Sequence, residues 1–255
     1  MLTPIDLTTR QEGSPLGRTS PLVKLGLALG WLVGLLFTSQ ALPPLVLAGI
    51  ALAAGAVLGR IPGRRLAGGL APLLTAAASI TVANALFGAA NLDPSASVLL
   101  TLGPIRLTAE AVSAGLAVGA RVVAISSVGV VFAQTTDPTR LVDALVQQAR
   151  APTRFAYGAL AAYQAVPRLA QDLATLRQAR RVRGLRRSWH PRLLVGLLVR
   201  SIRHADQLAL AMDARAFGSG PRTDFRPIRW TVTDLVVAAG GLGVLVIVLG
   251  LGRQL

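Results

Sequence analysis

Long apolar stretches separated by polar links dominate the chain. They run from Pro21 to Thr38, Leu42 to Leu58, Leu66 to Gly88, Leu107 to Ala133 and Val232 to Gly252. An α-helix needs about 20 residues to cross the roughly 30 Å hydrocarbon core of a bilayer. Each stretch is near that length. The pattern therefore predicts an all-α polytopic membrane protein with about five transmembrane helices.

The segment between the fourth and fifth stretches has a different pattern. Its apolar residues recur every three or four positions, at Val166, Leu169, Leu173 and Leu176, and again at Leu198, Ile202, Ala205, Ala209 and Met212. This spacing is typical of amphipathic helices. We expect two or three long amphipathic helices here, counting a shorter one that Asp137 and Pro138 would start. Gly184 and Gly218 are expected to end the two longer helices.

Composition indicates that lipid is the main solvent of this chain. Hydrophobic residues make up 53% of the 255 residues and charged residues only 15%, whereas soluble domains average about 25% charged residues. The net charge of +15 comes almost wholly from arginine, because Lys24 is the single lysine. The sequence has no cysteine, which excludes disulfides, thiolate metal sites and cysteine nucleophiles.

The arginines in the short links indicate orientation. Three of them lie between the second and third stretches, namely Arg60, Arg64 and Arg65. The links 39–41 and 89–104 carry only Asp93. Because short cytoplasmic loops are enriched in basic residues, the arginine-rich link and the N-terminus are expected inside, and the C-terminus outside.

The region from Arg140 to Arg229 concentrates the positive charge. It holds 17 arginines and only five acidic residues, Asp143, Asp172, Asp206, Asp213 and Asp224. Hydrocarbon cannot surround such a region as a whole. We therefore expect a cytoplasmic N-terminal segment at 1–20, transmembrane helices at 21–133, a cytoplasmic helical region at 134–229 and a C-terminal transmembrane helix at 230–255.

Two similar tripeptides fall where the amphipathic helices are expected to end. They are Val182-Arg183-Gly184 and Ala214-Arg215-Ala216, and their arginines lie 32 positions apart. Each guanidinium offers several donors, so the two ends could bind carboxylates or backbone carbonyls of one partner. Spacing alone favours a plainer role, in which each arginine complements the helix macrodipole and the anionic lipid surface.

Taken together, these pieces resemble one family, the transmembrane T component of energy-coupling factor transporters, which are ABC-type importers of vitamins and metal ions. The resemblance spans nearly the whole chain. It is carried by Ser14-Pro15 with Pro21-Leu22-Val23-Lys24-Leu25, Ala120-Arg121-Val122-Val123, Gln134-Thr135-Thr136-Asp137-Pro138, Ala165-Val166-Pro167-Arg168-Leu169 with Asp172, and the two arginine tripeptides.

The resemblance implies a coupling subunit and reverses the preference for the plainer role. The tripeptides would end coupling helices that insert into two cytoplasmic ABC-type ATPase subunits, with Arg183 and Arg215 as the essential residues. The helices would then tilt a separate substrate-binding membrane subunit, the S component, during uptake of a vitamin, a precursor or a metal ion. The chain itself would hold no cofactor, because ATP and magnesium would be bound by partner subunits. The expected location is the bacterial inner membrane, crossed several times, with the coupling region cytoplasmic.

This sequence departs from the family pattern at three positions. Val182 replaces the usual alanine, and Ala216 replaces the usual glycine or serine. Asp172 stands where the family more often has glutamate. The fit of each tripeptide to a partner is therefore less closely defined than the role of its arginine.

A few other polar residues are candidates for a buried charge or a metal site. Arg121 lies near the middle of the fourth stretch, and Glu110 lies roughly 16 Å away along the same helix, too far to pair with it. A charge at that depth requires a partner from another helix or a polar cavity, so we interpret Arg121 as a structural anchor. His190 and His204 have no ligand cluster around them in the sequence and predict no metal site.

Two other function classes remain as alternatives. A polytopic membrane enzyme acting on lipid or prenyl substrates would gather acidic residues around magnesium, whereas the acids here are scattered. The second alternative is a nucleic-acid-binding or lipid-binding membrane protein, which the excess of arginine suggests. Nucleic-acid binding would need more aromatic residues and a known module, so no nucleic-acid partner is expected. No glycine-rich loop followed by lysine and serine or threonine occurs, so ATP hydrolysis is expected in other chains.

Overall fold

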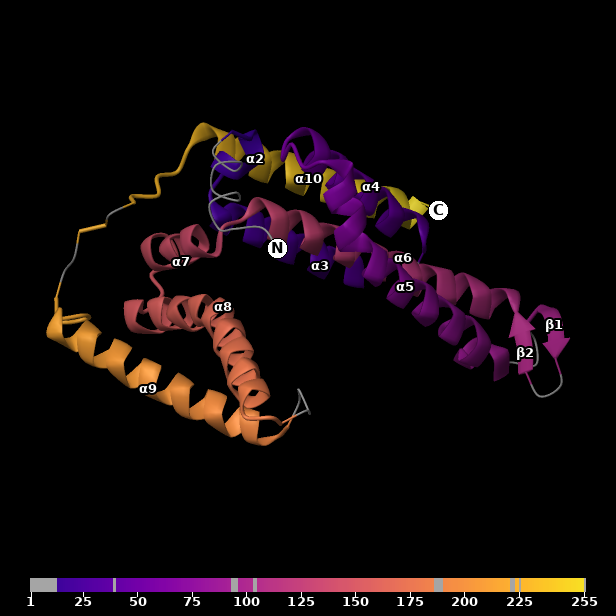
Figure 1. Ribbon diagram of the computed structural model, residues 1–255. Helices are drawn as coiled ribbons and strands as arrows, with labels where there is room; N and C mark the ends of the chain where they lie inside the picture. Colours follow the sequence, from indigo (N-terminus) through magenta and orange to yellow (C-terminus); the bar gives the residue numbers. More distant parts are fainter. Residues whose placement is uncertain are drawn as a thin grey trace. The chain divides into compact units, whose positions relative to one another are not determined.

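The computed structural model describes residues 13–38, 40–92, 96–102, 105–185, 190–220, 223–224 and 226–254. Most of these residues lie in helices (Figure 1), which confirms the all-α fold class. The predictions for the first twelve residues of the N-terminal segment and for Asp93 lie outside the described residues. The elements are α2 Pro15–Arg18, α3 Pro21–Leu36, α4 Leu42–Val57, α5 Gly63–Phe87, the 3-10 helix η1 Ala89–Leu92, β1 Val98–Leu102, β2 Ile105–Thr108, α6 Ala109–Thr135, α7 Pro138–Gln147, α8 Thr153–Val182, α9 Arg192–Ala214 and α10 Val232–Gln254.

The chain divides into two compact units. The first, here called the membrane unit, comprises residues 1–141 and 229–255 and contains α2 to α6 and α10. The second, called the arginine-rich unit, comprises residues 142–228 and contains α8 and α9. The chain passes from one to the other within α7.

Each apolar stretch of the sequence forms a helix in the membrane unit. Three helical segments among the described residues are long and apolar enough to cross a membrane, namely Gly63–Asn91, Ala109–Thr135 and Val232–Gly250. Helices α3 and α4 are apolar but have 16 residues each, which corresponds to only about 24 Å. The predicted set of about five spans therefore consists of three full-length candidates and two shorter apolar helices.

Two helix boundaries differ from the sequence prediction. Helix α5 begins at Gly63, directly after Pro62, so that Arg64 and Arg65 lie in its first turn instead of in a link. Helix α6 begins at Ala109, because Thr108 caps it by accepting a hydrogen bond from the Ala111 amide.

The short hairpin of β1 and β2 was not predicted. Its antiparallel strands pair Leu100 with Leu107 and Leu102 with Ile105, with an irregularity between Val98 and Leu100. Asn91 ties the hairpin to the helices, because its Oδ1 accepts from the amide and the hydroxyl of Thr108, both at 3.0 Å. The Asn91 Nδ2 donates to the carbonyl of Ala85 at 2.8 Å. A single buried amide therefore joins the end of α5, the hairpin and the start of α6.

Small residues allow α5 and α6 to pack closely. A Cβ on Gly115 would lie 2.8 Å from the carbonyl oxygen of Thr81 and 3.1 Å from the amide of Ala85. Close approach of this kind is the usual basis of helix association in lipid. A second contact region joins α3, α4, α6 and α10 through an apolar cluster whose members include Trp31, Leu47 and Leu245.

One end of the membrane unit gathers several chain segments through hydrogen bonds. The Leu16 amide donates to the carbonyl of Leu58 at 3.2 Å, which places α2 beside the end of α4. The Lys24 Nζ donates to the carbonyl of Thr135 at 2.7 Å, at the last residue of α6. The carboxylate of Asp234, at the start of α10, accepts from the Ser20 amide at 2.6 Å. The N-terminal segment, the arginine-rich link and the end of α6 thus share one end of the unit.

The arginine-rich unit is built on an antiparallel pair of long helices. Asp172 on α8 and Arg200 on α9 form a salt bridge of 2.9 Å, and Arg168 Nη1 lies 2.8 Å from the Nε2 of His204. Figure 1 shows that α8 bends along its length. Pro167 lies inside α8 and accounts for the bend, because proline has no amide hydrogen to donate to the preceding turn.

Candidate functional site

The first arginine tripeptide forms the C-terminal cap of α8. Arg183 is the cap residue, and Gly184 follows it with a φ of +76°. The Gly184 amide donates to the carbonyl of Arg181 at 3.0 Å, and the Leu185 amide donates to that of Arg180 at 3.2 Å. This pair of bonds defines a Schellman motif, in which a left-handed residue closes the helix. Gly184 therefore ends α8 as predicted.

The second tripeptide forms the same motif at the end of α9. Arg215 is the cap residue, the Ala216 amide donates to the carbonyl of Asp213 at 2.9 Å, and the Phe217 amide donates to that of Met212 at 3.0 Å. Ala216 takes the left-handed position with a φ of +53°. The prediction that Gly218 ends this helix was wrong, because the helix closes two residues earlier, at Ala216. The side chain of Ala216 does not prevent that conformation but makes it less favourable.

We expect opposite effects from substitutions at the two left-handed positions. The substitution Ala216→Gly should stabilise the end of α9 and Gly184→Ala should destabilise the end of α8, each by about 1 kcal/mol, because only glycine adopts positive φ without a steric cost. Hydrogen exchange of the amides of residues 184–185 and 216–217 measures both effects in the purified protein. Shifts of the same sign in the two variants would contradict the assignment of matching caps.

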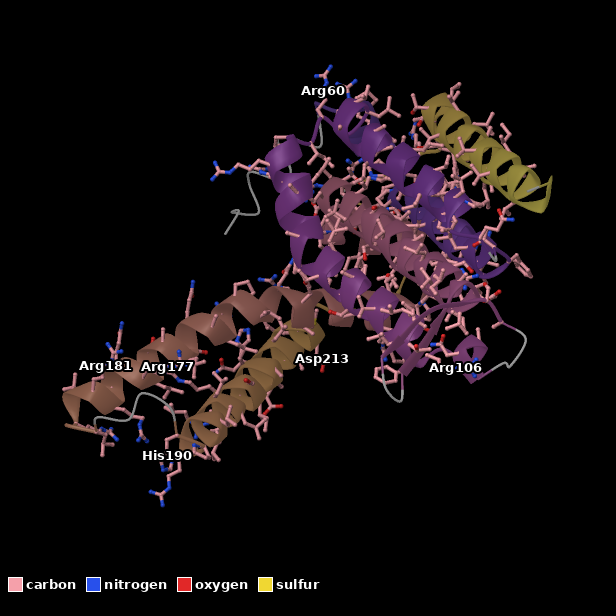
Figure 2. All side chains as sticks on the ribbon, turned by 90° about the vertical axis from the view of Figure 1, so that its right-hand side faces the viewer. Arg60, Arg106, Arg177, Arg181, His190 and Asp213 are labelled. Carbon is pink, nitrogen blue, oxygen red and sulfur yellow. The ribbon has the colours of Figure 1, made fainter. Side chains whose placement is uncertain are left out.

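The two caps lie at opposite ends of the helix pair. Contacts between Asp172 and Arg200 and between Leu176 and Gly196 establish the antiparallel register. The two caps are therefore separated by about the length of α9, whose 23 residues correspond to roughly 34 Å. Figure 2 shows Arg181 and His190 at one end of the pair and Asp213, close to the second cap, at the other. This separation fits two docking sites and not a single groove.

Both caps expose the side chains that a partner would meet. Val182 is 89% exposed, and Arg183 and Gly184 beside it are also exposed. Ala214, Arg215 and Ala216 are exposed as well.

Aromatic residues brace the cap of α9. The ring of Phe217, which follows Ala216, packs edge to face on Tyr157 of α8 with ring centroids 6.3 Å apart. The Tyr157 hydroxyl donates to a carboxylate oxygen of Asp143 at 2.9 Å. Burial of the hydroxyl, together with this hydrogen bond and the negative charges of Asp143 and Asp224, raises the pKa of Tyr157 to about 12. The phenol therefore remains protonated and keeps donating to Asp143.

Sequence reasoning missed this brace. Tyr157, Phe217 and Asp143 lie far apart in the sequence, and no local pattern joins them. Their one local signal is that Phe217 follows the second tripeptide directly, in the position where an apolar residue usually packs in a Schellman motif.

The remaining candidate residues belong to neither cap. Arg121 Nη2 donates to the carbonyl of Thr38, just after α3, so its partner belongs to another segment of the membrane unit. Glu110 Oε1 accepts from the hydroxyl of Ser97 at 3.0 Å, beside the hairpin. Asp172 pairs with Arg200 across the helix pair, where a half-exposed salt bridge contributes about 0 to 1 kcal/mol.

Histidine and acidic residues do not converge in the described parts of either unit. Among these residues, no group of three or more histidine, aspartate or glutamate side chains is placed to hold a metal ion. His204 contacts Arg168, and His190 Nδ1 accepts from the Arg192 amide at 3.1 Å. Among the described residues, the two exposed helix caps are therefore the candidate functional site.

Comparison with known proteins gives a consistent picture. The family model CbiQ, described as cobalt transport protein, matches residues 12–225. The energy-coupling factor transporter transmembrane protein EcfT of Heliobacterium modesticaldum is 26% identical over 253 residues, covering 92% of both chains. The EcfT protein of Streptococcus equi subsp. equi is 29% identical over 173 residues, or 61% of this chain and 62% of that protein.

A further relative carries a different name. A Bifidobacterium longum protein named as an ABC transporter ATP-binding protein, BL0043, is 27% identical over 158 residues. The match covers 55% of this chain and 20% of that protein. The chain thus spans less than two thirds of the length of some of its relatives.

Proposed function

The chain belongs to the CbiQ family and is the transmembrane T component of an energy-coupling factor transporter; from this premise, we propose that it couples two cytoplasmic ABC-type ATPases to a separate substrate-binding membrane subunit. The transported substrate would be a vitamin, a precursor or a metal ion. One observation carries the proposal: two helices end in the same capping motif, each with an exposed arginine, at opposite ends of an antiparallel pair.

The geometry suits transmission of force. A Schellman cap fixes the direction of the backbone beyond the helix, so the arginine at each cap is held by a rigid element. A guanidinium can form two parallel hydrogen bonds with a carboxylate or bind carbonyls that line a groove. If each ATPase binds one cap, movement of the two ATPases toward each other loads both ends of the α8–α9 pair. The salt bridge of Asp172 with Arg200 and the contact of Arg168 with His204 resist sliding of the helices.

The proposed partners follow from the same premise. The relative named as an ABC transporter ATP-binding protein supports partners of the ABC type. Two ATPase subunits, one for each cap, would bind ATP and magnesium, and this chain would bind neither. A substrate-binding S component would lie beside the chain in the bilayer. We propose no nucleic-acid partner.

We propose that the caps face the cytoplasm. Arg60 lies at the same end of the membrane unit as the N-terminal segment, because its Nη1 donates to the carbonyl of Gly13 at 3.2 Å. Thr135, the last residue of α6, lies at that end as well. The enrichment of cytoplasmic loops in arginine assigns this end to the inner face of the bacterial cell membrane.

The enzyme alternative has no support. The family to which the chain belongs is a transport family, and the described acidic residues do not gather around a common point. No observation on the described residues supports an enzyme that acts on lipid or prenyl substrates.

Affinity purification of the tagged chain from its native membrane tests the proposal. We expect ABC-type ATPase subunits and one other integral membrane protein to co-purify, and ATP-dependent uptake to require all of them in proteoliposomes. Purification of the chain without any ATPase, together with uptake by the chain alone, would refute the proposal.

A further inference from the structure

The membrane unit contains an apolar cavity that the coupling proposal does not use. It has a volume of about 370 Å³ and lies between α3, α4, α6 and α10, within the range of roughly 300 to 1,000 Å³ of small-molecule sites. Apart from Lys24 and Thr135, every residue that lines it is apolar or glycine. The Trp31 Nε1, the one other polar group, donates to the carbonyl of Gly241 at 2.9 Å.

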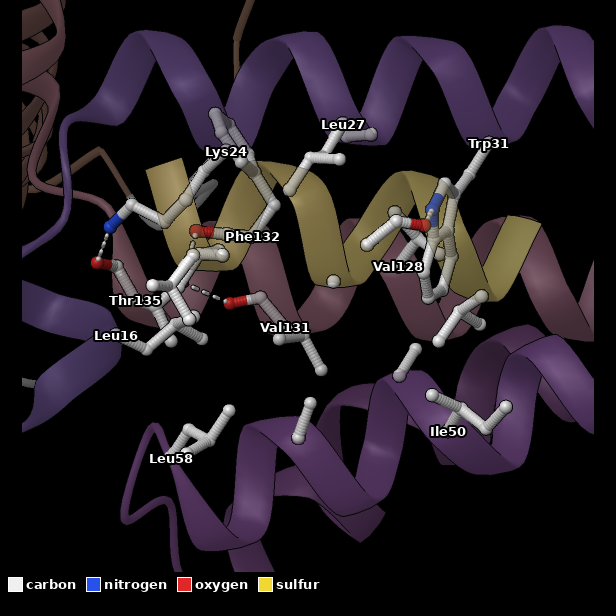
Figure 3. A pocket seen from close by; sticks show the side chains of 18 residues that line it. Leu16, Lys24, Leu27, Trp31, Ile50, Leu58, Val128, Val131, Phe132 and Thr135 are labelled. Atoms are coloured by element: carbon white, nitrogen blue, oxygen red, sulfur yellow. Dashed lines mark hydrogen bonds between the residues drawn. The ribbon is translucent and has the colours of Figure 1, made fainter. Parts of the chain in front are cut away.

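The cavity is elongated along the helices (Figure 3). Its lining runs from Lys24 to Trp31 on α3, from Val128 to Thr135 on α6 and from Ile50 to Leu58 on α4. Seven or eight helical residues correspond to about 10 to 12 Å. An extended hydrocarbon chain fits such a slot, whereas a compact ligand would leave part of it empty.

The slot opens beside α10. Val236 lines it and is 63% exposed, and Gly240 in the lining is also exposed. Because α10 is a candidate membrane span with most of its surface uncovered by its own chain, this opening faces the region that lipid occupies. An acyl chain can therefore enter from the bilayer.

Positive charge lies at one end of the slot. Lys24 reaches this end and donates to the carbonyl of Thr135. Arg140 Nη1 donates to the carbonyl of Gly17 at 3.0 Å, next to Leu16, which also lines the slot. The carboxylate of Asp234, which interacts electrostatically with Lys24, is the negative charge beside these two cations. The local balance of two positive charges and one negative charge favours an anion.

We infer that the slot binds an anionic phospholipid, with one acyl chain between α3, α4, α6 and α10 and the phosphate group at the Lys24 end. The bound lipid would fill the space between α10 and the other three helices and fix the position of α10. This inference concerns the membrane unit alone and does not depend on the coupling role of the caps.

Glycines on α10 provide a matched pair of variants. Gly240 lines the slot and is exposed, and a Cβ there meets no atom within 4 Å, so Gly240→Leu places a larger side chain at the mouth of the slot without a backbone clash. A Cβ on Gly243 also meets no atom within 4 Å, but Gly243 does not line the slot. An acyl chain excluded from the slot returns to bilayer hydrocarbon and not to water, so the effect of Gly240→Leu comes from overpacking. We expect it to lower lipid retention by about tenfold.

Native mass spectrometry of the purified complex measures this effect. We expect wild-type protein and Gly243→Leu to retain phosphatidylglycerol in preference to phosphatidylcholine with the same chains, and Gly240→Leu to lose it. The substitution Arg140→Gln should reduce the preference for the anionic lipid, because it removes the positive charge and keeps a polar side chain. Equal retention by Gly240→Leu and Gly243→Leu, or equal retention of the two lipids by wild-type protein, would overturn the inference.

A second measurement does not depend on the folding of Gly240→Leu. With Trp189→Phe and Trp230→Phe, Trp31 remains as the single tryptophan and lines the slot. Brominated phosphatidylglycerol, diluted into ordinary lipid, should quench Trp31 fluorescence more strongly than brominated phosphatidylcholine at the same mole fraction. Identical quenching by the two lipids would show random contact with the bilayer and exclude a selective site.

Discussion

Replacing Arg183 and Arg215 together by glutamate is expected to abolish co-purification of the ATPases and substrate uptake. Loss of a buried, charge-paired guanidinium costs about 2 to 5 kcal/mol of binding free energy, which is roughly 30-fold to several thousandfold in affinity. In the proposed complex, each glutamate would also be repelled by the ATPase carboxylates that pair with the arginines. Because the caps lie at opposite ends of the α8–α9 pair, each single variant should weaken binding and the double variant should eliminate it.

A matched control separates this effect from a general loss of positive charge. Arg203 lies in the middle of α9 and is exposed, like Arg183 and Arg215. The substitution Arg203→Glu changes the net charge by the same amount as each single variant but leaves both caps intact, so it should retain the ATPases. The coupling role would be rejected if the double variant retained the ATPases and wild-type uptake, or if Arg203→Glu lost them to the same extent.

Replacing Asp234 by alanine is expected to destabilise the membrane unit more than any exposed substitution. The carboxylate is 2% exposed and accepts hydrogen bonds from the Ser20 amide and from the amide and hydroxyl of Thr231. It also interacts electrostatically with Lys24. Its removal deprives the buried Ser20 amide of this acceptor and the buried Lys24 ammonium of a nearby negative charge, at a cost of about 3 to 5 kcal/mol.

Thermal unfolding of the purified protein in detergent measures the loss. We expect Asp234→Ala to lower the Tm by about 10 °C, given the usual shift of a few degrees per kcal/mol for a chain of this size. The exposed Asp224 offers a control, because Asp224→Ala removes one negative charge outside the membrane unit. A Tm equal to that of Asp224→Ala would contradict the anchoring role of Asp234.

The features that local patterns specify could be predicted from the sequence. Apolar stretches of about 20 residues gave the membrane helices, since their length alone decides whether they can span a bilayer. Asp137 caps α7 as expected, with its Oδ1 accepting from the Thr139 amide at 2.9 Å. The periodic apolar positions and Gly184 correctly predicted α8 and its end, because a glycine beyond a helix signals a left-handed cap.

Features that depend on distant residues could not be predicted in the same way. The bonds of Lys24 with Thr135 and of Ser20 with Asp234 join residues 111 and 214 positions apart. No local pattern identifies such partners. Ala216 was overlooked as a helix end because alanine rarely adopts positive φ, and the glycine two positions later gave a stronger but misleading signal. The β1–β2 hairpin was not predicted, because β1 lies within the expected link 89–104 and the two strands have only five and four residues.

Cysteine cross-linking from the two caps tests the central claim most directly. Because the sequence contains no cysteine, Val182→Cys and Ala214→Cys each introduce a single reactive thiol beside one of the two arginines. We predict that both positions cross-link to ATPase subunits, and that the protein carrying both cysteines links two ATPase copies at once, whereas Arg203→Cys links none. Absence of ATPase cross-links from either cap, or attachment of both caps to one ATPase copy, would contradict the account.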